Sequence, residues 1–204
     1  MSFLDKLLGL DTQVFLFLNG LHTSFLDLPM YYISKIWPWI PLYLGVMIYM
    51  VYKWKKSAVW MILALVLCVV FTDQITNLIK YSCERLRPSR APELMGMVHH
   101  VKNYRGGGYS FVSGHASNTF GFALLSSLIL KNRTYSLLIF LWASVIVYSR
   151  IYLGVHYPLD ILAGISLGLT IAGSLYLLLS LVLRKLSTKN LPISLQENGV
   201  SNAF

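Results

Sequence analysis

Long apolar stretches separated by short polar segments make up most of this chain. A helix needs about 17–25 apolar residues to cross a bilayer, and the pattern predicts five such spans. They cover residues of about 26–52, 57–80, 111–130, 135–153 and 158–183. We therefore expect an all-α fold, a polytopic membrane helical bundle with about five transmembrane helices in one compact domain.

The N-terminal segment differs from these spans. Residues 1–24 mix apolar side chains with polar ones such as Asp5 and Asp11. The segment is too interrupted to span and predicts an interfacial amphipathic helix. Residues 25–185 then form the membrane domain, and the polar residues 186–204 are expected to form a flexible cytoplasmic tail.

The composition supports a membrane protein and argues against a nucleic-acid-binding one. Of the 204 residues, 56% are hydrophobic and only 12% are charged, whereas soluble domains carry about 25% charged residues. The formal net charge is +9, but a chain embedded in the bilayer has little soluble surface for nucleic acid. We interpret the basic excess as cytoplasmic anchors together with an anion site. The expected partner is the lipid bilayer, and no obligate protein partner is indicated.

Basic residues cluster after alternate spans. Lysine or arginine follows spans one, three and five: Lys53, Lys55 and Lys56, then Lys131 and Arg133, then Arg184, Lys185 and Lys189. If five spans alternate, these residues share one side, which the positive-inside rule makes cytoplasmic. The opposite, extracytoplasmic face then receives three polar segments, at 81–110, 113–115 and 150–160.

Two residues of the last segment have the spacing of a nucleophile and its orienting acid. His156 and Asp160 share one face of a first helical turn if the last span begins near Tyr157 or Pro158. A carboxylate bonded to one ring nitrogen fixes the tautomer and leaves the other nitrogen free to act as a nucleophile. Taken alone, the pair also fits an interfacial histidine beside an N-cap acid.

The start of the third span is suited to binding an anion. Free N–H groups at a helix start bind anions, Gly114 allows close approach, and the hydroxyl of Ser113 can also donate. His115 would then lie beside a bound phosphate, placed as a general acid. The alternative is a serine N-cap followed by a surface histidine.

Three cations flank these segments. Arg150 can grip phosphate oxygens in two places through its planar fork. Lys80 and Arg87 lie about two helical turns apart, so we expect them to face the same way. Each cation taken alone also fits snorkelling or anchoring at the membrane interface.

The loop at 84–110 contains glycines and paired histidines. Gly106, Gly107 and Gly108 predict a flexible hinge, which would suit a lid. Adjacent residues such as His99 and His100 rarely point the same way and no acidic cluster accompanies them, so no metal site is predicted. The loop arginines fit either contact with a large anionic headgroup or attraction to anionic lipid; they are Arg85, Arg90 and Arg105.

Three motifs therefore occur in order along the chain. They are Lys80-x6-Arg87-Pro88, Val112-Ser113-Gly114-His115 and Ser149-Arg150-x5-His156-x3-Asp160. This arrangement resembles the signature of the type 2 phosphatidic acid phosphatase family, K-x6-R-P, P-S-G-H and S-R-x5-H-x3-D, whose core is shared with vanadium-dependent haloperoxidases. The resemblance covers residues of about 57–184. Val112 stands where the family has proline, which would mainly set the turn into the helix.

The resemblance implies an integral membrane phosphatase that needs no metal or other cofactor. His156 would attack phosphorus to form a phosphohistidine, Asp160 would orient it, and His115 would protonate the departing lipid oxygen. The phosphoryl oxygens would be held by Lys80, Arg87, Arg150, Ser113 and the N–H of Gly114.

The resemblance also implies a membrane lipid phosphate or diphosphate as substrate. It places the protein in the bacterial inner (plasma) membrane, with its site facing the periplasm or outside. Undecaprenyl diphosphate is expected first, because its recycling is widespread, and lipid A phosphates and phosphatidylglycerol phosphate are the alternatives.

Two other function classes compete with a phosphatase. A non-catalytic transporter or scaffold for anionic lipids would need the cations but not His115 or the pair of His156 and Asp160. An intramembrane serine protease using Ser113 would leave the cations without a role.

Overall fold

The chain folds into helices, as a computed structural model of residues 2–189 shows. The seven longer helices are α1 (Phe3–Gly20), α2 (Ser24–Ile33), α3 (Ile40–Trp54), α4 (Ala58–Cys83), α5 (Gly114–Leu130), α6 (Arg133–Tyr152) and α7 (Pro158–Lys189). Four 3-10 turns join them: η1 (Trp37–Trp39), η2 (Lys55–Ser57), η3 (Pro88–Arg90) and η4 (Pro92–Leu94). No strand occurs within residues 2–189, so the predicted all-α fold class is confirmed.

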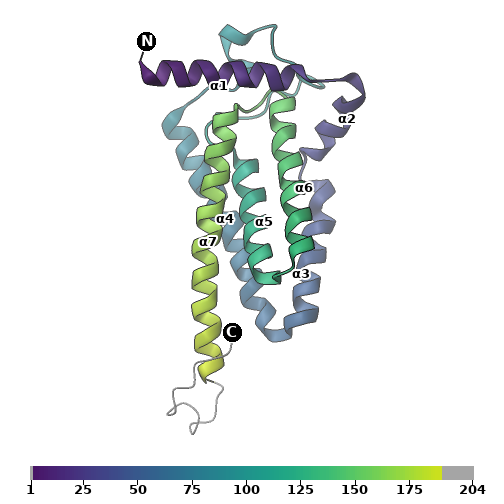
Figure 1. Cartoon of the computed structure of the whole chain (residues 1–204), viewed down its shortest axis with the longest axis vertical. Helices are drawn as coiled ribbons and strands as arrows, with labels where there is room; N and C mark the ends of the chain where they lie inside the picture. Colours follow the sequence, from purple (N-terminus) through teal and green to yellow (C-terminus); the bar gives the residue numbers. More distant parts are fainter. Residues whose placement is uncertain (1, 190–204) are drawn as a thin grey trace.

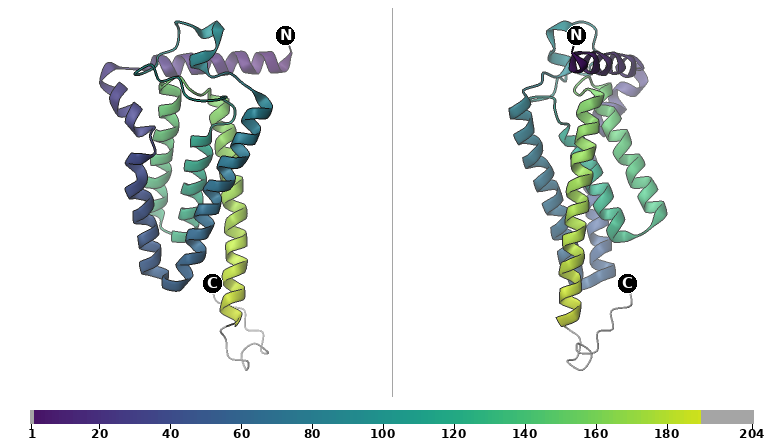
Figure 2. Two further views of the ribbon diagram at one scale, coloured as in Figure 1. Left: turned by 180° about the vertical axis from the view of Figure 1, so that it is seen from behind. Right: turned by 60° about the vertical axis from the view of Figure 1, so that its left-hand side comes forward.

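Helices α3 to α7 form an upright bundle, and α1 lies across one end of it (Figure 1). Helix α5 is in the middle and packs against α4, α6 and α7. The two further views show the long loop between α4 and α5 at the end that carries α1 (Figure 2). The segment between α6 and α7 also lies at this end (Figure 1). The polar segments therefore gather at one end, as the sequence predicts.

Three stretches of the described chain are long and apolar enough to cross a membrane. They are Trp37–Leu94, which contains both α3 and α4, Arg133–Tyr152 and Pro158–Leu186. Helices α3 and α5 have only 15 and 17 residues, or about 23 and 26 Å at 1.5 Å per residue. Both are shorter than a hydrocarbon core of about 30 Å. The bundle thus has the expected five helices, two of which are short.

The predicted first span at 26–52 is wrong as a single helix. Its first part is α2, which ends at Ile33, and η1 then leads into α3. Pro38 in η1 and Pro41 in the first turn of α3 explain the break, because proline suits a helix start and interrupts a continuing helix.

Helix α1 has a polar inner face and an apolar outer face. Its buried residues, Asp11, Phe15 and Asn19, are spaced four apart and face the bundle. The amide of Asn19 donates to the carbonyl oxygens of Ile151 and Tyr152 over 3.0 and 2.9 Å, where α6 leaves carbonyls without helical partners. The outward side chains are exposed and apolar, and include Phe3, Leu4, Leu10 and Phe17.

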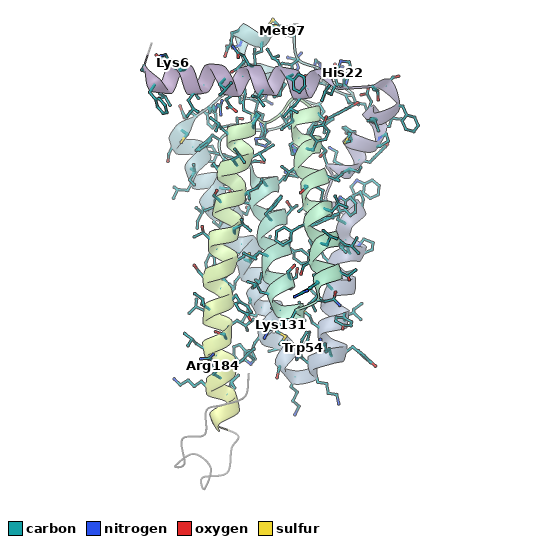
Figure 3. The ribbon with its side chains drawn as sticks, in the orientation of Figure 1. Lys6, His22, Trp54, Met97, Lys131 and Arg184 are labelled. Atoms are coloured by element: carbon teal, nitrogen blue, oxygen red, sulfur yellow. The ribbon has the colours of Figure 1, made fainter. Side chains whose placement is uncertain are left out.

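Basic side chains lie at the other end of the bundle. Lys131 and Arg184 are at the end opposite Lys6 and His22 (Figure 3). This agrees with the predicted grouping of the basic residues that follow alternate spans. Helix α7 continues to Lys189, past the expected domain boundary at 185; the remainder of the predicted tail lies outside the described residues.

Candidate active site

His156 and Asp160 meet at the start of α7. Nδ1 of His156 lies 3.5 Å from Oδ2 of Asp160, and both side chains are buried. The last helix begins at Pro158, as predicted, but His156 precedes it, so the two residues do not share a helical turn. Instead, the carboxylate reaches back across the helix start. A separation of 3.5 Å exceeds a usual hydrogen bond of about 2.7–3.2 Å, and such catalytic contacts often shorten when substrate binds.

The carboxylate of Asp160 is held by other groups at both oxygens. Oδ2 accepts a hydrogen bond from the backbone N–H of Tyr157 over 2.8 Å and another from the hydroxyl of Ser110. Oδ1 accepts from Nη1 of Arg85 over 2.7 Å. The contact with Tyr157 is the backward half of a capping box, in which an acid in the first turn bonds to the N–H that precedes the helix. Asp160 is therefore fixed in place independently of His156.

His156 presents its second ring nitrogen to Arg87. Nη1 of Arg87 lies 3.1 Å from Nε2 of His156. Because a guanidinium only donates, Nε2 accepts, and the proton of the neutral ring sits on Nδ1 facing Asp160. Burial lowers the pKa of His156 to about 3, and the charge of Arg87 acts in the same direction. The imidazole is thus neutral at pH 7, with a lone pair on Nε2.

The glycine loop wraps around Arg87. Nε and Nη2 of Arg87 donate to the carbonyl oxygen of Gly107 over 3.0 and 2.7 Å, and Nη1 donates to that of Val155 over 2.7 Å. Gly106 has φ +67°, and a Cβ there would stand 3.1 Å from the Arg87 side chain. The loop therefore positions this guanidinium. The prediction that it is a lid is not tested.

Arg150 and Ser113 have polar atoms without partners. Nε and Nη1 of Arg150 and Oγ of Ser113 are buried and have no hydrogen-bond partner in the described part of the chain. Nη2 of Arg150 contacts the hydroxyl of Tyr104 over 3.1 Å. Burial raises the pKa of Tyr104, but the charge and hydrogen bond of Arg150 outweigh it, so this pKa is lowered. Unpaired buried donors are costly, and an anion would satisfy them.

Lys80 and Arg87 do not lie on one helix. Lys80 is in the last turn of α4, and Arg87 follows the C-cap residue Glu84, which has a left-handed backbone conformation. The prediction that both face the same way along a helix is therefore wrong. Lys80 still reaches the start of α5, because its Nζ would lie 3.6 Å from a Cβ placed on Gly114.

His115 occupies the first turn of α5 and bonds to the end of α2. Its Nε2 is 3.0 Å from the carbonyl oxygen of Ser34. A carbonyl only accepts, so Nε2 carries a proton. Arg150 and Lys80 are charged groups near enough to act on His115.

The sequence analysis missed several residues that contact this cluster. Arg85 was expected to contact either a large anionic headgroup or anionic lipid, but its two terminal nitrogens bond to Asp160 and Asp11 over 2.7 Å each. Ser110 and Tyr104 belong to none of the three motifs. Nothing about the predicted donors Ser113 and Arg150 indicated that α1 supplies an acid, Asp11, to the same network. For Arg85, its position two residues before Arg87 was the only available signal.

His99 has a partner outside this cluster. Its Nε2 is 2.8 Å from Oδ1 of Asp27, and its ring stacks on that of His22 with centroids 3.7 Å apart. His100 bonds instead to the carbonyl oxygen of Val98. The adjacent histidines therefore have separate neighbours.

Comparisons with known proteins identify the family of this chain. The model of the PAP2 superfamily matches residues 57–184. A lipid A 4'-phosphatase of Porphyromonas gingivalis is 35% identical over 175 residues, covering 85% of this chain and 74% of the relative. Another, of Bacteroides thetaiotaomicron, is 37% identical over 170 residues, covering 81% and 75%.

A solved structure shares the fold. It is the transmembrane PAP2 type phosphatidylglycerolphosphate phosphatase of Bacillus subtilis, with a TM-score of 0.65 and 22% identity, covering 88% of this chain and 87% of that one. The match to the family model and the identity to the two curated relatives agree with the order of the three motifs. The chain therefore belongs to the PAP2 superfamily and is a membrane phosphatase that hydrolyses phosphate esters of lipids.

Proposed function

We propose that the cluster around His156 is the active site and that it transfers a phosphoryl group through this histidine. The observation that carries the proposal is the set of buried donors without partners, Nε and Nη1 of Arg150 and Oγ of Ser113. A phosphate bound among them would satisfy all three, since it offers several strong acceptor oxygens. Lys80 and the N–H of Gly114 would complete the binding site at the start of α5.

Phosphoryl transfer would begin at Nε2 of His156. Because the ring is neutral, Nε2 can attack phosphorus without first losing a proton. The new N–P bond leaves the imidazole positive, and the carboxylate of Asp160 stabilises that charge. The bond from phosphorus to the lipid oxygen breaks, and His115, which is protonated and positive beside the bound phosphate anion, gives this oxygen a proton and becomes neutral.

Hydrolysis of the intermediate would reverse the proton movement. His115, now able to accept, takes a proton from water as that water attacks phosphorus. The N–P bond breaks, inorganic phosphate leaves, and His156 returns to its neutral form. Arg87 and Arg150 hold the charge that develops on the phosphoryl oxygens in both steps.

We infer that the substrate is a phosphate monoester of lipid A. Two relatives with 35% and 37% identity are lipid A 4'-phosphatases, and each covers more than four-fifths of this chain. The expectation of undecaprenyl diphosphate rested only on how widespread that reaction is, so the lipid A alternative is now preferred. Exposed cations of the outer loop, such as Arg90 and Lys102, suit an anionic saccharide headgroup.

We further propose that the site faces the periplasm from the inner membrane. The support is the position of Lys131 and Arg184 at the opposite end of the bundle (Figure 3). By the positive-inside rule that end would be cytoplasmic. The apolar outer face of α1 would then lie in the interface between the inner membrane and the periplasm.

The substrate is tested by phosphate release from a panel of purified lipids. Wild type and His156→Ala are assayed with lipid A bisphosphate, undecaprenyl diphosphate and phosphatidylglycerol phosphate in the same detergent. We expect the highest kcat/KM with lipid A, one phosphate lost per molecule, and no release by His156→Ala. A tenfold preference for undecaprenyl diphosphate would contradict the lipid A assignment, and release by His156→Ala would contradict the mechanism.

A further inference from the structure

We propose that Asp11 and Arg85 are positioning residues, which hold the carboxylate of Asp160 for its work on His156 and so make α1 part of the catalytic unit. The inference rests on the proposed role of His156. Neither Asp11 nor Arg85 is a specified residue of the three motifs, since Arg85 stands at one of the x positions of Lys80-x6-Arg87-Pro88. Asp11 also precedes the part of the chain that matches the family model, residues 57–184.

Arg85 bridges two buried carboxylates. Its Nη2 is 2.7 Å from Oδ2 of Asp11, and its Nη1 is 2.7 Å from Oδ1 of Asp160. The two carboxylate side chains are 1% and 0% exposed, while that of Arg85 is 20% exposed. One guanidinium thus bonds to two buried acids and balances one of their two negative charges.

The rest of the bridge is also constrained. The guanidinium of Arg85 lies over the ring of Tyr157, 3.9 Å from its centroid. Oδ1 of Asp11 accepts the backbone N–H of Leu159 over 2.9 Å, at the start of α7. Asp11 therefore contacts both the arginine that holds Asp160 and the helix turn that carries Asp160. Both terminal nitrogens of Arg85 are thus bonded to carboxylates.

Charge balance explains why the bridge matters for the reaction. Without Arg85, Asp11 and Asp160 would be two buried, mutually repelling carboxylates, and one of them would bind a proton. Whichever acid takes the proton, Asp160 would lose the bond that holds its Oδ1, and its carboxylate would be less well placed to stabilise the positive imidazole that forms when His156 attacks phosphorus. Without the negative charge of Asp11, Arg85 would keep Asp160 but lose the contact that fixes its own position.

The helix α1 would transmit this effect from the membrane surface. Asp11 lies on the same buried stripe as Phe15 and Asn19, while the opposite face of α1 is apolar and exposed. If that apolar face lies in a lipid interface, α1 is held in place and Asp11 keeps its ion pair with Arg85. The structure thus assigns a catalytic purpose to an N-terminal segment outside the motifs.

The test compares steady-state kinetics of Arg85→Gln, Arg85→Lys, Asp11→Asn and the double variant Asp11→Asn/Arg85→Gln. Misplacing a reacting group by about 1 Å costs roughly 100-fold in rate, so we expect kcat to fall about 10- to 100-fold in Arg85→Gln. KM should stay within about threefold, since no substrate contact is lost. Arg85→Lys should recover part of kcat, and the double variant should resemble Arg85→Gln rather than show the product of both losses.

Matched controls remove the same charges elsewhere. Arg105→Gln removes an exposed cation from the same loop, and Asp5→Asn removes an exposed acid from α1; both should retain wild-type kcat. A rise in KM with unchanged kcat in Arg85→Gln would show headgroup binding and overturn the proposal. So would kcat losses equal to those of the two controls.

A second measurement separates this proposal from the proposed function. Orthovanadate resembles five-coordinate phosphorus, so we expect it to raise the melting temperature of wild type, and to do so much less in Arg85→Gln than in Arg105→Gln. If wild type releases phosphate from no lipid of the panel, the proposed function fails, but this comparison still tests the bridge. Equal vanadate shifts in Arg85→Gln and Arg105→Gln would overturn the bridge even if wild type is active.

Discussion

Nη1 of Arg87 lies 3.1 Å from Nε2 of His156, so a guanidinium holds the lone pair that would attack phosphorus. The same guanidinium also bonds to the carbonyl oxygens of Gly107 and Val155. A phosphate that enters the site would give Arg87 better acceptors than an imidazole lone pair. Binding of the phosphate would therefore free Nε2 at the moment when the electrophile is in reach.

Removing the charge of Asp160 should slow the chemical step. In Asp160→Asn the amide keeps the size of the side chain but no longer stabilises a positive imidazole or fixes its tautomer. By analogy with other histidine-orienting acids, we expect kcat to fall about 10³- to 10⁴-fold. Steady-state assays in detergent measure this, with circular dichroism as the control for folding. A loss of less than about fivefold would contradict the role of Asp160.

The glycine loop offers a matched pair of substitutions. Gly106 and Gly96 both have positive φ, +67° and +80°, so alanine strains the backbone at each. Only at Gly106 would the new Cβ meet Arg87, at 3.1 Å; at Gly96 no described atom lies within 4 Å. We expect Gly106→Ala to reduce kcat/KM at least tenfold more than Gly96→Ala. Equal losses in the two variants would show that the position of Arg87 does not matter.

Whether a site residue could be predicted depends on how far along the sequence its contacts lie. Phosphoryl transfer was indicated by residue types and by their order along the chain, at His115, Arg150 and His156. The start of α7 near Pro158 was predicted, whereas the end of α4 before Arg87 was not. Periodicity in an apolar segment does not show where the last helical turn ends.

Long-range contacts explain the remaining failures of the sequence analysis. Arg85 and Asp11 are 74 residues apart, and nothing local distinguishes a bridging arginine from one that faces a lipid headgroup. The bond from His115 to the Ser34 carbonyl similarly joins two segments 81 residues apart. The helical bundle was predicted correctly, whereas the first predicted span is broken between α2 and α3, at Pro38 and Pro41.

Close packing of α5 on α7 should be sensitive to a single methyl group. A Cβ on Gly168 would lie 2.2 Å from the carbonyl oxygen of Ser117, whereas one on Gly173 would have no described atom within 4 Å. Overpacking costs about 1–3 kcal/mol, which corresponds to about 3–10 °C in a domain of this size. We expect a melting temperature lowered by this amount in Gly168→Ala and little changed in Gly173→Ala. Equal melting temperatures would contradict the packing.

Acid should destabilise the protein through His156. Its pKa is about 3 in the folded state against 6.5 in the unfolded chain. Between these values the unfolded state binds the extra proton, so stability falls as pH drops from about 6.5 towards 3. The slope is at most about 1.4 kcal/mol per pH unit for one proton.

A variant without the imidazole isolates this contribution. We expect His156→Gln to lose less stability than wild type between pH 7.5 and pH 5, as measured by thermal unfolding in detergent. All other titrating groups are common to both proteins, so they cancel in the comparison. Identical pH slopes would show that His156 is not held neutral by burial.

Trapping the covalent intermediate tests the central claim most directly. Wild type is mixed with lipid phosphate carrying ³²P and quenched in base, where a phosphohistidine survives, and the labelled peptide is then sequenced. We predict label on His156, lost on mild acid treatment and missing from His156→Ala, and stronger labelling when water attack is slowed in His115→Ala with a good leaving group. Label on Ser113, or turnover by His156→Ala at the wild-type rate, would contradict the account.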